Sequence, residues 1–100
     1  MVMRAREIAD GKATGEFSYG DACRVAAVVL EDAHDEIVVV DMEGSRTCSA
    51  ALARLVVLRR RLLEAGRDLR ISGLSGRAKS LYDINRMSAV LPVDSAALHQ

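Results

Sequence analysis

Three hydroxyl groups, Ser45, Thr47 and Ser49, lie close together in the sequence, and Ser49 stands where a long predicted helix begins. The free amides and the dipole of a helix N-terminus stabilise a phosphate group, so this position suits a phosphorylated serine. A phosphoserine adds up to about two negative charges and would alter a binding face through repulsion or desolvation. We therefore take Ser49 as the main candidate for phosphorylation, with Thr47 and Ser45 as weaker ones. The simpler interpretation, and the more common use of serine here, is that Ser49 only caps the helix.

The other reactive groups of this stretch do not assemble a catalytic centre. Cys48 precedes the helix, where thiols gain reactivity, but no histidine or second cysteine lies near it in the sequence. Asp41 either positions the loop amides through hydrogen bonds or simply ends a strand. The chain shows no acid–base pair, no nucleophile with a histidine partner and no metal-ligand spacing. We therefore expect no enzymatic activity, no cofactor and no metal.

A second glycine-containing loop, Gly73–Lys79, resembles a phosphate-binding loop only superficially, because it lacks the G-x-x-x-x-G-K-[ST] spacing. We interpret it as a turn followed by a helix that Ser75 caps. The arginine run Arg59–Arg61 is interpreted as a solvated helix flank whose alkyl stems cover apolar surface. Its alternative role is a docking stripe for an acidic partner.

A strand and a long helix must position the hydroxyl groups. Residues 36–41 form the clearest strand, because four consecutive β-branched residues, Ile37–Val40, suit a strand buried in the centre of a sheet. Residues 49–65 form the long helix, and Gly66 suits the left-handed conformation that ends a helix. The loop between them follows the carboxyl end of a strand, which is the usual functional edge of an α/β protein.

The remaining segments complete an alternating pattern. In chain order we expect an edge strand over residues 1–9, a turn at 10–12, the returning strand of a hairpin over 13–17, a helix over 22–31, a strand over 68–72, a helix over 77–84, a short edge strand over 89–93 and a final helical turn over 94–100. Ser18 or Asp21 caps the first helix. The order ββαβαβα predicts an α/β fold with a mixed sheet of about four to five strands, because helical crossovers join parallel neighbours and the hairpin adds an antiparallel pair.

Composition narrows the class of protein further. The chain has 100 residues, enough for a single domain over residues 1–100, and its formal net charge of +0 argues against nucleic acid as a partner. No apolar run approaches the length that spans a bilayer, so we expect no membrane insertion. The N-terminal stretch MVMRAREIADGK lacks the apolar region of a signal peptide, which predicts a cytoplasmic protein.

The segments GEFSYGDACRVAAVVLEDA, IVVVDMEG, CSAALARLVVLRRRLLEAGRDLRISGLSG and SLYDINRMSAVLPV follow one another along the chain. Together they resemble the STAS domain of bacterial anti-sigma factor antagonists and of sulfate-transporter tails. The resemblance covers nearly the whole chain and is strongest over residues 37–93. It implies a STAS-like fold.

The family's phosphorylation motif, D-S-S-G-L at the start of the long helix, matches the segment Cys48–Leu52 by the spacing of its leucine. In this register Cys48 stands at the aspartate, Ala50 at the phosphorylated serine and Ala51 at the glycine. A different placement of the gap puts Ser49 at the phosphorylated position. The resemblance therefore implies either phosphorylation of Ser49 or a partner-binding protein without this switch.

The resemblance also implies a non-enzymatic regulator of sigma-factor-dependent transcription, whose partner is a kinase-type anti-sigma factor. The expected partner surface consists of Asp41, Met42, Glu43, Gly44, Arg46, Thr47, Cys48, Ser49, Ala50, Leu52 and Ala53. The pattern C-S-A-A-L is also similar to the D-[ST]-A-G-L of STAS subunits in bacterial phospholipid-transport ATPases, so a structural subunit is the first alternative. A module that senses a small ligand is another, and a homodimer stays open.

Overall fold

Three short parallel strands form the centre of the molecule in a computed structural model that describes residues 1–9 and 15–94. The strands are β1 (Val2–Arg4), β3 (Ile37–Asp41) and β5 (Asp68–Ser72), in the order β1–β3–β5. The pairing places Val39 of β3 between Val2 and Arg70. Because β3 lies in the middle, its valines 38–40 are buried as predicted, whereas Ile37 at the start of the strand is exposed.

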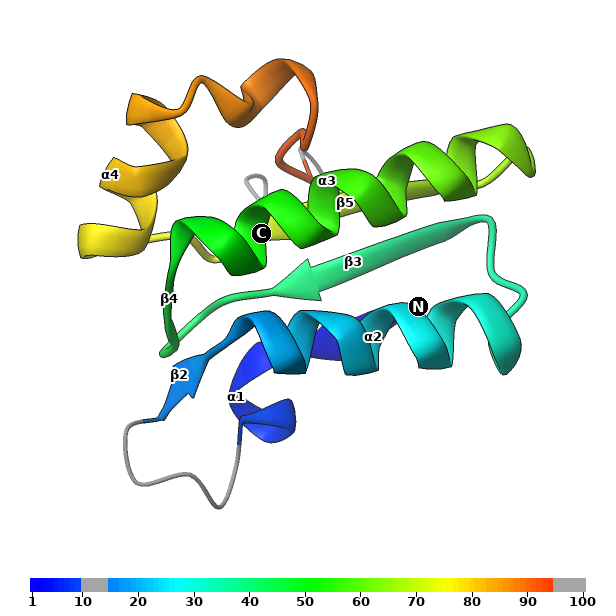
Figure 1. Ribbon diagram of the computed structural model, residues 1–100, viewed down its shortest axis with the longest axis horizontal. Helices are drawn as coiled ribbons and strands as arrows, with labels where there is room; N and C mark the ends of the chain where they lie inside the picture. The colour runs from blue at the N-terminus through cyan, green and yellow to red at the C-terminus, as the bar shows by residue number, and fades with distance from the viewer. Residues whose placement is uncertain (10–14, 95–100) are drawn as a thin grey trace.

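Two helices, α2 (Tyr19–Glu31) and α3 (Ser49–Glu64), lie side by side over one face of this sheet (Figure 1). Each belongs to a crossover between neighbouring parallel strands, and right-handed crossovers that step the same way along a sheet place their helices on the same face. The core between sheet and helices is mainly aliphatic and includes Val25, Val29, Val38, Val40, Leu52, Leu55, Leu58, Leu62, Leu69 and Ile71. Full burial of each such side chain stabilises the fold by roughly 1.5–3 kcal/mol.

The start of α2 is closed by a reciprocal pair of hydrogen bonds. The Ser18 side chain accepts one from the Asp21 amide at 3.2 Å, and the Asp21 carboxylate accepts one from the Ser18 amide at 2.9 Å. Asp21 is buried, and its other oxygen pairs with Arg24 at 2.9 Å. This capping box confirms the predicted cap and explains why a valine-rich segment is helical.

A separate parallel ribbon pairs β2 (Glu16–Phe17) with β4 (Arg46–Thr47). The expected antiparallel hairpin at the start of the chain is therefore wrong, and every strand pair among the described residues is parallel. The physical reason is the short helix α1 (Ala5–Ile8), which ends β1 early and takes the chain away from the sheet before β2 begins. The expected turn at residues 10–12 and the first part of the expected returning strand lie outside the described residues.

The last described elements, α4 (Gly76–Ile84) and the 3₁₀ helix η1 (Met87–Ala89), follow β5. The buried Tyr82 hydroxyl donates a hydrogen bond to the Leu91 carbonyl at 2.6 Å, which ties α4 to the chain beyond η1. The expected strand over residues 89–93 is reduced to a single parallel bridge between Val93 and Ile71. The helical turn expected over 94–100 falls outside the described residues beyond Asp94.

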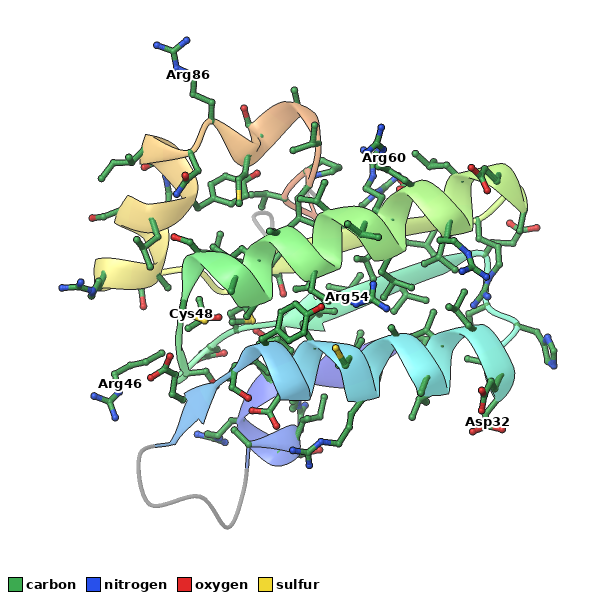
Figure 2. All side chains as sticks on the ribbon, viewed as in Figure 1. Asp32, Arg46, Cys48, Arg54, Arg60 and Arg86 are labelled. Carbon is green, nitrogen blue, oxygen red and sulfur yellow. The ribbon has the colours of Figure 1, made fainter. Side chains whose placement is uncertain are left out.

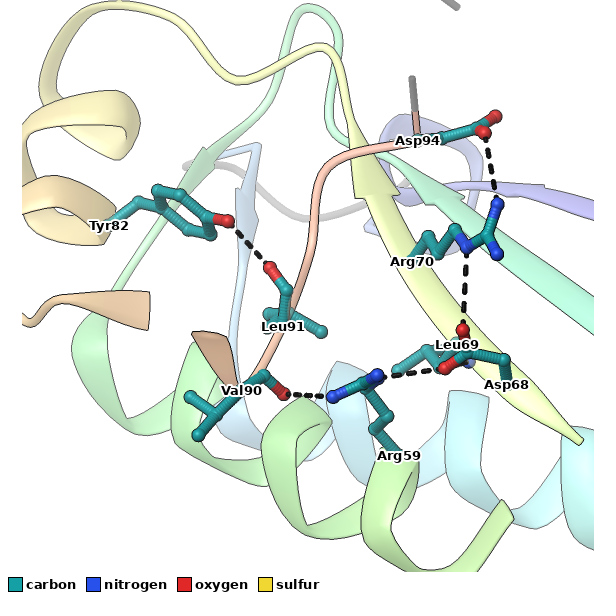
Figure 3. Close-up of polar contacts among 8 residues, drawn as sticks. All are labelled: Arg59, Asp68, Leu69, Arg70, Tyr82, Val90, Leu91 and Asp94. Carbon is teal, nitrogen blue, oxygen red and sulfur yellow. Dashed lines mark hydrogen bonds and ion pairs between the residues drawn. The ribbon is translucent and has the colours of Figure 1, made fainter. Parts of the chain in front are cut away.

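Asp68 joins three segments at the opposite end of β5 from the loops (Figure 3). Its carboxylate accepts hydrogen bonds from Arg59 of α3 and from the Leu69 amide, each at 2.8 Å, and Arg59 also donates to the Val90 carbonyl at 3.4 Å. Burial opposes ionisation of this carboxyl, but the hydrogen bonds from Arg59, Leu69 and Arg70 and the charge of Arg59 hold its pKa below the ordinary value. The cluster fixes α3 against β5 and the C-terminal segment.

The described residues thus form an α/β fold with four α-helices, which confirms the predicted α/β class. The expected mixed sheet of about four to five strands is wrong, because in this part of the chain the central sheet has three strands, β2 and β4 form a separate ribbon, and all pairs are parallel. None of the helices in this part of the chain has the length and apolar character needed to cross a bilayer.

Candidate functional site

The loop between β3 and β4 is held by hydrogen bonds on both sides. The Asp41 carboxylate accepts one from the Glu43 amide at 3.0 Å, and the Met42 amide donates to the Ser72 carbonyl of β5 at 2.8 Å. The Ser45 amide donates to the Met42 carbonyl at 3.0 Å and closes the turn. Asp41 therefore positions a loop amide, which is the more specific of its two sequence-based interpretations.

Two glycines let neighbouring segments approach this loop. Gly44 has a positive φ of 74°, and Arg6 of α1 lies against it, with side-chain atoms 3.5 Å from where a Cβ would stand. Gly73, in the loop after β5, also has a positive φ and packs against Asp41 and the Glu43 backbone. The β3–β4 loop is thus flanked by α1 on one side and by the β5–α4 loop on the other.

Thr47 anchors the end of the loop inside the molecule. It is buried in β4 and its hydroxyl donates a hydrogen bond to the Phe17 carbonyl at 3.0 Å. The hydroxyl oxygen of Ser45 is also buried, and the described residues offer it no hydrogen-bond partner. Both hydroxyl groups are less accessible to a modifying enzyme than that of Ser49, whose residue is exposed.

Helix α3 begins one residue earlier than a Ser49 cap requires. Cys48 occupies the N-cap position in an extended conformation, and Ser49 is the first helical residue, so the cap prediction for Ser49 is wrong. The β2–β4 pairing keeps the chain extended through Thr47, and the helix follows directly after Cys48. No side-chain hydrogen bond caps α3, and its first turn holds no acidic residue. The hydroxyl of Ser49 is therefore not used to close the helix.

The residues expected at the partner surface separate into two groups. Exposed or half-exposed side chains that a partner can reach are Asp41, Glu43, Gly44, Arg46, Cys48, Ser49, Ala50 and Ala53. The other three, Met42, Thr47 and Leu52, lie in the interior instead. Met42 and Leu52 pack into the core, and Thr47 is held by its hydrogen bond to the Phe17 carbonyl, so these residues support the surface and do not form it.

A cleft of about 540 Å³ lies beside Ser49, between the starts of α3 and α4. The residues that line it are Glu16, Arg46, Thr47, Cys48, Ser49, Arg77 and Leu81. Figure 2 shows Arg46 extending away from the body of the molecule and Cys48 at the start of α3. The sequence had suggested neither Arg77 nor Leu81 for this site. The available signal was the expectation that helical crossovers join parallel neighbours, since the helices that follow two such strands start at the same edge of the sheet.

A smaller cleft of about 300 Å³ lies on the other side of the loop, lined by Arg4, Arg6, Asp41 and Glu43. Arg4 pairs with Glu7 at 3.6 Å on the surface, so this cleft mixes charges of both signs. Within the described residues no group of three or more histidine, cysteine, aspartate or glutamate side chains is arranged to hold a metal ion. What the β3–α3 junction offers is an accessible serine, small exposed side chains and arginines around a cleft, which is chemistry for recognition.

Comparisons with models of protein families, with curated proteins and with solved structures found no match for this chain.

Proposed function

We propose that this protein is a non-enzymatic regulatory module of the STAS type that binds a partner protein through the β3–β4 loop and the first turns of α3. The partner that we propose is a kinase-type anti-sigma factor, so that binding would release a sigma factor for transcription. The resemblance of the sequence to anti-sigma factor antagonists supplies the partner class, and the exposed junction supplies the surface.

The observation that carries the proposal is the position of Ser49, Ala50 and Ala53. These three exposed residues follow one face of the first turns of α3, while Leu52 between them is fully buried. Small side chains let a partner backbone approach the helix closely, and the anchored loop beside them loses little conformational freedom on binding. A surface that is both accessible and rigid suits protein recognition.

Phosphorylation of Ser49 would switch this surface. The partner kinase would transfer the γ-phosphoryl group of ATP to the Ser49 hydroxyl oxygen, with loss of the hydroxyl proton and release of ADP. The product places about two negative charges at the start of α3, where the free amides and the helix dipole stabilise them. The added charge and its hydration shell would weaken a complex that buries this turn.

The test is a binding titration by calorimetry between this protein and kinase-type anti-sigma factors encoded in the same genome. We expect a stoichiometric complex with one of them, and we expect Ala53→Arg to weaken it at least about tenfold, because a large cation would stand in the contact. Leu63→Arg is the matched control, since Leu63 is also exposed on α3 but lies at its far end. Equal effects of the two variants, or no complex with any such factor, would refute the proposed function.

A further inference from the structure

Ser49 and Arg77 line the same cleft although they belong to different helices. The arrangement follows from the sheet, because β3 and β5 are parallel neighbours and the segments after them leave from the same edge. Helix α4 packs against both β4 and α3, so its first turn is held beside that of α3. The second residue of α4 therefore faces the same cleft as the first residue of α3.

The charges in this cleft differ in what surrounds them. Arg46 lies opposite Glu16 in the β2–β4 ribbon, which sets one cation beside one anion. Arg77 is exposed, and across the described residues its guanidinium makes no hydrogen bond and no ion pair. Two arginines and one glutamate leave an excess of positive charge around a serine hydroxyl. Leu81 supplies the apolar part of the α4 wall.

We propose that Arg77 binds the phosphate of phosphorylated Ser49, and that modification thereby closes the cleft between α3 and α4. This inference rests on the proposed phosphorylation and adds the residue that binds the phosphate. A guanidinium group matches a phosphate with two parallel hydrogen bonds, a geometry that lysine does not offer. Arg46 adds a second positive charge at the opposite wall, and Glu16 turns the phosphate towards α4 by repulsion.

Binding of the phosphate by Arg77 changes how the switch acts. Charge repulsion alone would leave the cleft open and only disfavour an acidic partner. A phosphate held by Arg77 instead joins the first turns of α3 and α4 across the cleft, so that a partner side chain that contacts Ser49 or Arg77 there is excluded. Phosphorylation then releases the partner by occupying its site.

The experiment uses the full chain with phosphoserine installed at position 49 during synthesis, so that no kinase is needed. Phosphorus NMR follows the second ionisation of the phosphate, whose pKa is about 6 when the group is solvated. We expect this ionisation to occur at a pH lower by at least about half a unit in the otherwise unchanged protein, because a neighbouring cation favours the dianion. In Arg77→Gln the pKa should move back towards the ordinary value, while the free amides of α3 and the charge of Arg46 still favour the dianion.

Arg86→Gln is the matched control, since it removes the same charge from an exposed arginine far from Cys48 and Arg46 (Figure 2). It should leave the phosphate ionisation unchanged, and Arg77→Lys should retain only part of the effect. An ionisation that is the same with and without Arg77, or one that shifts only in Arg46→Gln, would overturn the inference. Neither outcome bears on whether the unmodified protein binds its partner, so the two proposals fail separately.

Discussion

An added Cβ at Gly73 would lie 2.5 Å from the Oδ1 atom of Asp41, so the loop after β5 touches the carboxylate that ends β3. The same Cβ would lie 2.7 Å from the Glu43 amide nitrogen, which donates to that carboxylate. The loops that follow the two strands therefore pack as one unit. Any side chain between them must move the turn that leads to Ser49.

Gly73→Ala should therefore destabilise the protein strongly. The positive φ of Gly73 costs an alanine about 1–2 kcal/mol, and the clash with backbone and carboxylate adds roughly 1–3 kcal/mol. Gly66→Ala is the matched control, because Gly66 has a similar φ of 75° but nothing within 4 Å of its added Cβ. Urea denaturation should show a clearly larger loss of unfolding free energy for Gly73→Ala than for Gly66→Ala. Equal losses would mean that the contact of Gly73 with Asp41 and Glu43 does not affect stability.

The elements that the sequence predicted best are those whose local signals agree with their tertiary surroundings. The strand 37–41 combines β-branched residues with central burial, and α2 combines a capping box with an apolar face. The buried side of α3 includes Leu58, whereas Leu63 is 47% exposed. Helical spacing gives the direction of an apolar stripe, but its limits depend on where α2 and the sheet end.

The first residues of the chain could not be assigned in this way. Their loose alternation is compatible with a hairpin, and the pairing of β1 with β3 depends on contacts between residues far apart in sequence. The site was predicted as one loop, yet its cleft also needs Arg77 from α4. Arg77 looked like the first residue of an ordinary helix, because its neighbour across the cleft comes from another helix.

Thr47→Val should affect stability, while Ser49→Ala should affect function. Removing the Thr47 hydroxyl leaves the buried Phe17 carbonyl without its donor, at a cost of about 1–3 kcal/mol. Ser49 is exposed, so its loss should change the free energy of unfolding by less than about 0.5 kcal/mol. Thermal unfolding measures the first effect and a kinase assay the second. Phosphate labelling that persists in Ser49→Ala but disappears in Thr47→Val would reverse the assignment of the two hydroxyl groups.

Asp68→Asn should remove stability at neutral pH and little in acid. The pKa of the Asp68 carboxyl is lowered in the folded protein, so its stabilisation is present above the unfolded value of about 3.9 and is lost as the pH falls through the folded value. The difference between wild type and variant should be about 1–3 kcal/mol near pH 7 and should shrink below about pH 4. Asp32→Asn, at an exposed carboxylate, provides the control. A difference that does not depend on pH would contradict the role assigned to the Arg59–Asp68 pair.

Tyr82→Phe should separate two contributions of the Tyr82 hydroxyl to stability, its hydrogen bond and its ionisation. Burial raises the pKa of the Tyr82 hydroxyl, although the nearby charge of Lys79 acts in the opposite direction. The folded protein therefore keeps the phenol neutral at a pH where the unfolded chain ionises, and stability is fully present below about pH 10 and falls above it.

At neutral pH the variant loses the bond to the Leu91 carbonyl, which costs about 1 kcal/mol. Since phenylalanine does not titrate, the difference in free energy of unfolding between wild type and Tyr82→Phe should narrow from about pH 10 to pH 11. Tyr19→Phe, at an exposed position, should show neither effect. Chemical denaturation across this range measures the free energy of unfolding of each protein. A difference between wild type and Tyr82→Phe that stays constant would show that the folded state does not hold the Tyr82 proton more tightly than the unfolded chain.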